Sequence, residues 1–432
     1  MTAYIKTVIE RNKKNGNVGI SSICSANYYV LSAAMKRSKK DGQPLLIEAT
    51  SNQVDQYGGY TGMKPDDFKK YIYSIANELQ LPADRLILGG DHLGPNRWQE
   101  EPAIDAMSKA KVQIMSYVQA GFRKIHLDAS MPLQGDTKKD NMPLEIELVA
   151  DRTAELCAAA EEAAKDAETK PFYVIGTDVP IPGGALTSHE DIRITPVHEV
   201  EETIKATRSA FEERGLTDAW QRVIALVAQP GVEFSDTAVF EYRKDKAQPL
   251  KEKIKEYPAI AYEAHSTDYQ KKEDLRHMVN DHFAILKVGP WLTYAFREAV
   301  FALAFIEKEM LTGYASVQLS QLEETIENVM LWKPDYWKKH YHGNEVEQRL
   351  ARRYSLSDRI RYYWPQKEIQ EALNQLFENL TTYKPSLSLL SQYLPLQYEA
   401  IRAGEIGNNP LDIVLHKIDL VLQKYIYACG LS

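Results

Sequence analysis

Short runs of apolar and β-branched residues recur along roughly the first 290 residues, and longer amphipathic stretches separate them. The runs occupy residues 18–24, 45–49, 86–90, 125–128, 172–177, 223–228, 260–264 and 283–288. The stretches between them, such as 142–165 and 203–214, carry apolar residues at helical spacing, so each pair of runs predicts a parallel strand–helix–strand unit. Eight such units in series predict an α/β fold, a closed (β/α)8 barrel of the TIM-barrel type.

After about residue 293 the strand pattern stops, and Leu, Ile and Tyr recur at helical spacing. We therefore expect a barrel domain over residues 1–300 and a helical C-terminal extension over residues 301–432 that packs on the barrel. Aromatic residues are frequent at 336–342 and 362–365. They could cover the barrel mouth or form a subunit contact, but a place in the core of the extension is the favoured interpretation.

Composition and charge narrow the class of protein. Of the 432 residues, 44% are apolar and 26% charged, which is typical of a globular chain with a large core. The net charge of -8 argues against nucleic acid or an anionic membrane as a partner. The three cysteines form no CxxC pair, and no apolar stretch approaches the length needed to span a bilayer. Residues 1–12 contain no apolar signal-peptide core, so a cytoplasmic protein is expected.

Polar or glycine-rich clusters follow most of the predicted strands. In a barrel these strand ends meet on one rim, which is where barrel enzymes place their chemistry. After the second strand come Glu48, Asn52 and Gln53, and we expect these side chains to contact a substrate.

Adjacent Asp91 and His92, flanked by glycines, end the third strand. An imidazole there can hold a metal ion while the neighbouring carboxylate moves a proton, although a hydrogen-bonded structural pair is the alternative. On the seventh strand, Glu263 and His265 share a face because strand side chains alternate. We expect His265 to be a metal ligand and Glu263 a catalytic or orienting carboxylate, with a buried ion pair as the alternative.

Asp178, after the fifth strand, is the third predicted ligand, because three protein groups with an open position define a Lewis-acid site. His126 lies inside the fourth strand and is interpreted as a core histidine, while Asp128 is kept as a carboxylate that supports the site. His340 and His342 are interpreted as surface or lid residues.

Phosphate binding is predicted for loops that are rich in small residues. Barrel phosphate sites commonly use backbone N–H groups of the last loops and a helix N-terminus. Such groups also simply make turns, and none of these loops is a P-loop. The candidates are Gly183 and Gly184 after the fifth strand, Ser266 and Thr267 after the seventh, and Lys287, Gly289 and Thr293 at the eighth.

Several segments resemble a known family, the accessory subunit of class II D-tagatose-1,6-bisphosphate aldolase. They are residues 45–56, 89–98, 227–234, 263–270, 282–290, 359–365 and 391–395, which span almost the whole chain. The resemblance implies a class II aldolase-like barrel that acts in galactitol or N-acetylgalactosamine catabolism. It also implies a smaller catalytic barrel subunit as the partner that this chain stabilises and activates.

Catalytic subunits of that superfamily hold zinc with three histidines and use an aspartate beside the first for proton transfer. Asp91, His92 and His265 are similar to that pattern, whereas strand five offers Asp178 in place of a histidine. The resemblance therefore implies a divalent metal, zinc above all, and a sugar-phosphate substrate. A homo-oligomer is equally compatible with the sequence.

Two hypotheses follow for the function. In the first, which is favoured, the chain is the accessory subunit of the aldolase that cleaves tagatose 1,6-bisphosphate to dihydroxyacetone phosphate and glyceraldehyde 3-phosphate. In the second, it is itself a metal-dependent ketohexose-phosphate 4-epimerase. That enzyme would interconvert fructose 6-phosphate and tagatose 6-phosphate by retro-aldol cleavage.

Overall fold

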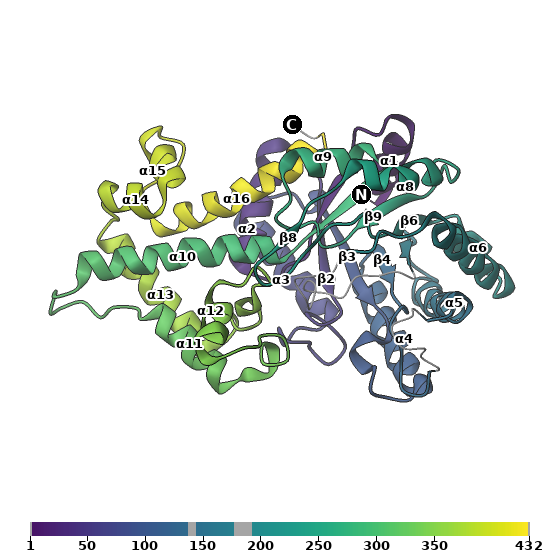
Figure 1. The fold of residues 1–432 in the computed structure, drawn as a ribbon, viewed down its shortest axis with the longest axis horizontal. Coiled ribbons are helices and arrows are strands. Elements are labelled where there is room, and N and C mark those ends of the chain that lie inside the picture. The colour runs from purple at the N-terminus through teal and green to yellow at the C-terminus, as the bar shows by residue number, and fades with distance from the viewer. Residues whose placement is uncertain (1, 137–143, 177–191, 431–432) are drawn as a thin grey trace.

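A closed barrel of parallel strands forms the centre of the molecule in a computed structural model that describes residues 2–136, 144–176 and 192–430 (Figure 1). Around the barrel the strands follow the order β1-β10-β9-β6-β5-β4-β3-β2. Their bounds are β1 (Ile20–Ile23), β2 (Leu45–Thr50), β3 (Leu86–Leu93), β4 (Lys124–Leu127), β5 (Phe172–Ile175), β6 (Val223–Val227), β9 (Ala261–Ala264) and β10 (Phe283–Val288). Each coincides with one of the predicted apolar runs, so the (β/α)8 barrel is confirmed.

Helices surround the strands, as expected for parallel strands that are buried on both faces. Between consecutive barrel strands lie α2 (Tyr28–Asp41), α3 (Pro65–Glu78), α4 (Ala103–Ala120), α5 (Ile146–Ala163), α6 (Val197–Glu213), α7 (Thr217–Trp220), α8 (Lys244–Ile254) and α9 (Lys272–Asn280), with the short turns η1 (Ala83–Arg85) and η2 (Pro95–Trp98). A small antiparallel ribbon of β7 (Glu233–Phe234) and β8 (Val239–Phe240) follows β6.

The barrel interior is apolar at its amino-terminal end. Inward-facing residues of the strands, among them Ile20, Leu46 and Ile87, form one buried cluster. The first helix, α1 (Thr2–Asn15), adds Ile5 and Val8 to the same cluster, so it packs across this end of the barrel. The polar interior residues therefore lie towards the carboxyl ends of the strands.

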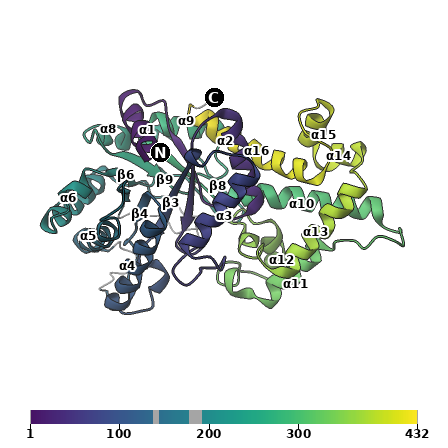
Figure 2. The same ribbon diagram turned by 180° about the vertical axis from the view of Figure 1, so that it is seen from behind.

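The C-terminal part of the described chain is helical and projects to one side of the barrel, as both views show (Figures 1 and 2). It comprises α10 (Pro290–Leu311), α11 (Leu322–Trp332), η3 (Pro334–Tyr336), α12 (Glu345–Tyr354), η4 (Arg359–Tyr362), α13 (Lys367–Thr382), α14 (Leu387–Tyr393), α15 (Pro395–Arg402) and α16 (Pro410–Ala428). Helix α16 returns to the barrel and packs against α2, α9 and α10.

Helix α10 runs without a break across residue 300, so the division into two domains at that residue stays a prediction. Among the described residues, no helix combines the length and apolar character that a membrane crossing requires.

Candidate functional site

Five charged side chains from different strands meet inside the barrel. This ion cluster consists of Glu48 on β2, Asp91 on β3, Lys124 on β4, Glu263 on β9 and Lys287 on β10. All five are buried, and the two lysines bridge the three carboxylates. Counting two positive against three negative charges leaves the cluster with one net negative charge, which favours an additional cation nearby.

Lys124 is completely buried, with Nζ 2.6 Å from Glu48 Oε1 and 2.5 Å from Glu263 Oε2. Gly89 makes room for this arrangement, because a Cβ there would lie 2.8 Å from Cγ of Glu48. The Lys124 ammonium and the two carboxylates that it contacts thus lie at the bottom of the site. A lysine without solvent contact can stay charged only when paired in this way.

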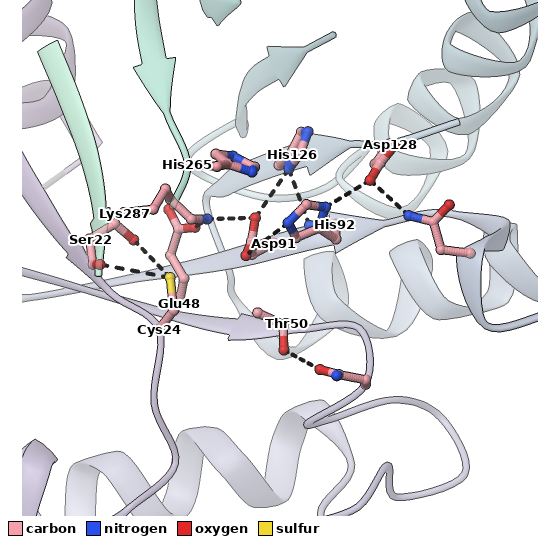
Figure 3. Close-up of polar contacts among 12 residues, drawn as sticks. Ser22, Cys24, Glu48, Thr50, Asp91, His92, His126, Asp128, His265 and Lys287 are labelled. Atoms are coloured by element: carbon pink, nitrogen blue, oxygen red, sulfur yellow. Dashed lines mark hydrogen bonds and ion pairs between the residues drawn. The ribbon is translucent and has the colours of Figure 1, made fainter. Parts of the chain in front are cut away.

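Lys287 lies nearer the mouth, beside Asp91 (Figure 3). Its Nζ is 2.5 Å from Asp91 Oδ1, 3.7 Å from Glu263 Oε1 and also bonded to Glu48. Burial opposes its charge, but the neighbouring acids, Asp91 foremost, hold the pKa of Lys287 well above its ordinary value. Burial likewise opposes ionisation of Asp91, yet His92 and Lys287 hold the pKa of this carboxyl well below its ordinary value. Asp91 is therefore an ionised acceptor.

Three histidines gather over the ion cluster, which makes His126 part of the site. The ring centroids of His92 and His265 are 4.7 Å apart, those of His92 and His126 5.1 Å, and those of His126 and His265 5.2 Å. The interpretation of His126 as a core histidine did not place it in this site. The sequence feature that could have done so is its two-residue spacing from Lys124, which puts both side chains on the inner face of β4.

Asp91 and His92 are sequence neighbours, yet both contribute to the site. Strand alternation would send them to opposite faces. His92 departs from this alternation because its backbone is left-handed, with φ of 49°. The pairing of β3 with β4 also shifts between Gly90 and Leu93. A non-glycine residue in this region costs on the order of 1–3 kcal/mol, and such strain clusters at functional sites.

Asp128 fixes the orientation of the His92 ring. Its Oδ2 lies 2.8 Å from His92 Nδ1 and also accepts from Asn96 Nδ2 at 2.7 Å (Figure 3). Burial lowers the pKa of His92, but the Asp91 and Asp128 carboxylates outweigh it and raise that pKa above its ordinary value. Asp128 therefore lies beside His92 and contacts its ring, and its supporting role stays a prediction.

Four of these residues could hold a metal ion. Asp91, His126, Glu263 and His265 each offer one ligand atom, and these atoms all lie within 4.8 Å of one another. Burial lowers the pKa of His265 to about 3, which keeps the imidazole neutral, the form that binds metal.

Two further observations fit a metal ion in this group. His126 Nδ1 accepts from the His92 backbone N–H at 3.2 Å and lies 3.1 Å from Asp91 Oδ1, while its buried Nε2 has no hydrogen-bond partner among the described residues. A metal ion would give this imidazole, which lies among the other donors, a partner. Two imidazoles and two carboxylates then suit a divalent ion.

All of the predicted residues except Thr267 and Thr293 fall into three sets. Asp91, His92 and His265 line a pocket at the mouth of the barrel together with Asn52, Gln53, Ser266, Lys287 and Gly289. Glu48, Asp128 and Glu263 lie buried around the pocket-lining groups. Asp178, Gly183 and Gly184 lie outside the described residues.

Some groups predicted to bind phosphate are occupied by the protein itself. The backbone N–H groups of Gly289 and Trp291 both donate to Asp268 Oδ1, at 3.1 and 2.8 Å. The Thr267 hydroxyl donates to the Lys287 carbonyl oxygen at 2.6 Å, and Thr267 is completely buried. The Thr293 hydroxyl donates to the Pro290 carbonyl oxygen and to Asp358. An anion in the pocket therefore needs other donors.

The extension contributes to the pocket wall. Arg361 and Tyr362 of η4 line it beside Tyr60, and the rings of Tyr60 and Tyr362 lie 4.8 Å apart. Trp337 and Trp364 are buried within the extension. The aromatic segments thus serve both as core and as cover of the barrel mouth.

Comparisons with known proteins agree with this geometry. The family model of the D-tagatose-1,6-bisphosphate aldolase subunit GatZ/KbaZ-like proteins matches residues 5–430. A crystal structure from Sinorhizobium meliloti 1021, described as a probable tagatose 6 phosphate kinase, is 42% identical in sequence, with a TM-score of 0.86. The match covers 95% of this chain and 100% of that one.

Two further solved structures are more distant. Fructose-bisphosphate aldolase from Campylobacter jejuni is 14% identical, with 89% and 93% of the two chains covered and a TM-score of 0.43. Fructuronate-tagaturonate epimerase UxaE from Cohnella laeviribosi is 10% identical, with 96% and 82% covered and a TM-score of 0.48.

Proposed function

The chain belongs to the D-tagatose-1,6-bisphosphate aldolase subunit GatZ/KbaZ-like family, and on that premise we propose that it is itself a metal-dependent ketohexose-phosphate 4-epimerase. It would interconvert fructose 6-phosphate and tagatose 6-phosphate. The observation that carries this proposal is that one chain gathers an ionised carboxylate, paired histidines and a metal-donor group around one pocket. A purely supporting subunit has no need of such costly buried charges.

The substrate chemistry explains why cleavage of a carbon–carbon bond is the suitable route. The C4 hydrogen of a 2-ketohexose is not α to the C2 carbonyl, so a base cannot remove it as an ordinary carbon acid. The C4 hydroxyl proton can be removed instead. The oxygen electron pair then forms a carbonyl at C4, the C3–C4 bond breaks, and its electrons pass to C3 and the C2 carbonyl oxygen. The products are an enediolate and glyceraldehyde 3-phosphate.

The pocket residues suit these proton transfers. Ionised Asp91 lines the pocket and takes the C4 hydroxyl proton. Lys287 lies beside it and favours the anionic form of Asp91. The His92–Asp128 pair holds a second proton at the pocket wall. After the aldehyde turns over and its carbonyl carbon is attacked by C3 on the opposite face, Asp91 returns the proton to the C4 oxygen.

The metal donors lie next to these groups. His126, His265 and Glu263 would hold a divalent ion, zinc in the first place, which leaves the neighbouring Asp91 carboxylate for proton transfer. When bound, such an ion supplies a Lewis acid for the C2 carbonyl oxygen and the negative charge that develops there.

The test uses the purified chain without any partner. We expect elemental analysis to find a divalent metal in stoichiometric amount. We also expect the chain to convert fructose 6-phosphate to tagatose 6-phosphate, which NMR can monitor. Asp91→Asn should lower kcat about 100- to 10,000-fold, the usual contribution of a positioned base. The matched control Asp66→Asn changes an exposed carboxylate on α3 and should leave kcat unchanged. Formation of a bisphosphate from ATP would instead indicate the kinase activity named for the Sinorhizobium protein.

Isotopes separate retro-aldol cleavage from other routes to the epimer. The C4 hydrogen stays on carbon throughout, so turnover in deuterium oxide should place no deuterium at C4. Added ¹³C-labelled glyceraldehyde 3-phosphate should appear in the hexose phosphate. Deuterium at C4 would refute this mechanism.

A second candidate is the accessory role in tagatose-bisphosphate cleavage, within galactitol or N-acetylgalactosamine catabolism. The family description as an aldolase subunit favours it. So do exposed apolar side chains on the extension, where Trp332 is 70% and Leu396 58% exposed. A chain that holds no metal and turns over no hexose phosphate, but raises the kcat of an added catalytic subunit, would establish this role instead.

A further inference from the structure

The pocket at the barrel mouth has two adjoining parts. The inner chamber, lined by Asp91, His92, His265 and Lys287, has a volume of about 80 Å³. The outer chamber has a volume of about 310 Å³ and lies between the loop after β1 and the extension. Residues common to both walls, among them Arg361, show that the chambers are neighbours. A ligand whose reacting carbons lie in the inner chamber therefore has the outer one next to it.

The two chambers differ in charge. The wall of the inner one carries charges of both signs, with Asp91 and Asp268 beside Lys287 and Arg361. The outer one has no acidic residue among its described lining residues, and Arg361 is the cation among them. Its remaining wall is aromatic, apolar or neutral polar, with Tyr28, Tyr71 and others. An anionic group in the outer chamber therefore meets the Arg361 cation without an acidic side chain in the wall, whereas in the inner chamber it also meets Asp91 and Asp268.

Arg361 is held in place by hydrogen bonds to neutral acceptors. Nη1 donates to the carbonyl oxygens of Ser357 and, at 3.1 Å, Asp358, while Nη2 donates to the Tyr362 hydroxyl at 2.8 Å. These bonds use three of the five N–H donors of a guanidinium. Within the described chain no carboxylate forms an ion pair with Arg361, unlike Arg352 and Arg353 of the same extension. The guanidinium is thus preorganised and has donors to offer.

Trp364 supplies a second, independent observation. The residue is 3% exposed and lines the outer chamber. Its indole Nε1 is buried and has no hydrogen-bond partner among the described residues. A buried donor without an acceptor is costly, so an acceptor that reaches the indole N–H removes the penalty. By contrast, Trp337 Nε1 donates to the Met330 carbonyl oxygen at 2.6 Å.

We propose that the outer chamber binds the phosphoryl group of the substrate, with the Arg361 guanidinium and the Trp364 indole N–H as its donors. The helical extension, rather than the glycine-rich loops of the barrel, then supplies the anion site and selects phosphorylated over unphosphorylated ketohexoses. The identity of the substrate rests on the function proposed above, whereas the anion site does not.

Isothermal titration calorimetry of the full chain tests the proposal, with fructose 6-phosphate, fructose and inorganic phosphate as probes. The wild type should bind fructose 6-phosphate more tightly than fructose. Arg361→Gln should weaken binding of both phosphate-containing probes about 10- to 100-fold, the range for charge-assisted hydrogen bonds, and leave fructose binding unchanged. Trp364→Phe should weaken binding of the two phosphate-containing probes about 2- to 10-fold.

Matched controls come from the same extension. Arg349→Gln removes an exposed charge, and Trp337→Phe removes an indole donor that is already satisfied within the protein. Neither should change the affinity for phosphate, although Trp337→Phe should lower the melting temperature. Arg361→Lys keeps the charge and should retain part of the affinity, and circular dichroism checks that each variant is folded.

The outcomes separate this inference from the proposed function. Equal binding of fructose and fructose 6-phosphate by the wild type, or unchanged phosphate affinity in Arg361→Gln, overturns the anion site even if epimerase activity is present. Loss of fructose binding in the same proportion also overturns it, because the residue would then be structural. Phosphate binding that depends on Arg361 in a chain without turnover supports the anion site and refutes the epimerase.

Discussion

Lys124→Met tests the ion cluster at its most buried point. The substitution keeps the length of the side chain but removes the charge that lies 2.6 Å from Glu48 and 2.5 Å from Glu263. The two carboxylates then face each other in the barrel interior without the ammonium between them. Removing one partner of a buried ion pair costs about 3–5 kcal/mol, because the remaining charge is left uncompensated.

The expected change in melting temperature follows from the size of the chain. Unfolding entropy of about 2.1 cal/mol/K per residue gives roughly 0.9 kcal/mol/K for 432 residues. A loss of 3–5 kcal/mol therefore corresponds to a decrease of about 3–6 °C in the melting temperature. Differential scanning calorimetry of metal-free protein measures it directly, and urea unfolding gives the free energy of unfolding.

A matched lysine lies on the surface. Lys70 pairs with Asp66 one turn away on α3 at 2.6 Å, and the two side chains are 72% and 59% exposed. Lys70→Met should change stability much less than Lys124→Met, since an exposed pair is screened by water. If Lys124→Met is no more destabilising than Lys70→Met, the lysine does not neutralise the carboxylates as described. Adding Glu48→Gln to Lys124→Met should recover part of the loss, because one uncompensated charge is removed.

Three further predictions concern other parts of the site. His126→Ala should abolish stoichiometric metal binding in equilibrium dialysis, whereas exposed His198→Ala should not; retained binding would remove His126 from the donor group. Gly94→Ala should lower the free energy of unfolding by about 1–3 kcal/mol in urea titrations, because its Cβ would lie 1.7 Å from the Asp128 carbonyl oxygen; an unchanged value would contradict that close approach. Burial raises the pKa of Glu233 from 4.5 to about 7, so between these values the folded protein binds more protons than the unfolded chain. Its contribution to stability should fall as the pH rises from about 4.5 to about 7, and Glu233→Gln should flatten this slope in urea titrations.

Much of the fold could be predicted because buried parallel strands are apolar along their whole length. Eight such runs, each bounded by turn residues, leave few alternatives to a barrel. The site was harder. Glu263 and His265 could be placed together by strand alternation, and the same rule applied to Lys124 and His126 would have placed them as well.

Other parts of the site could not be predicted from local pattern. Asp91 and His92 share a site only because His92 adopts a left-handed backbone, which no residue spacing indicates. Arg361 reaches the pocket through packing of the extension, about 270 residues along the chain from Asp91. Likewise, the backbone amide of Gly289 looks available in the sequence, and only the three-dimensional structure shows that it donates to Asp268.

Helix α1 packs across the amino-terminal end of the barrel, and this has a consequence for exchange with solvent. Ile5 and Val8 pack against the apolar strand residues at this end of the barrel. Water and protons therefore reach the ion cluster from the opposite end. Arg361 and Tyr362 line the pocket at that end, so the route from bulk water to the barrel interior passes beside the C-terminal extension.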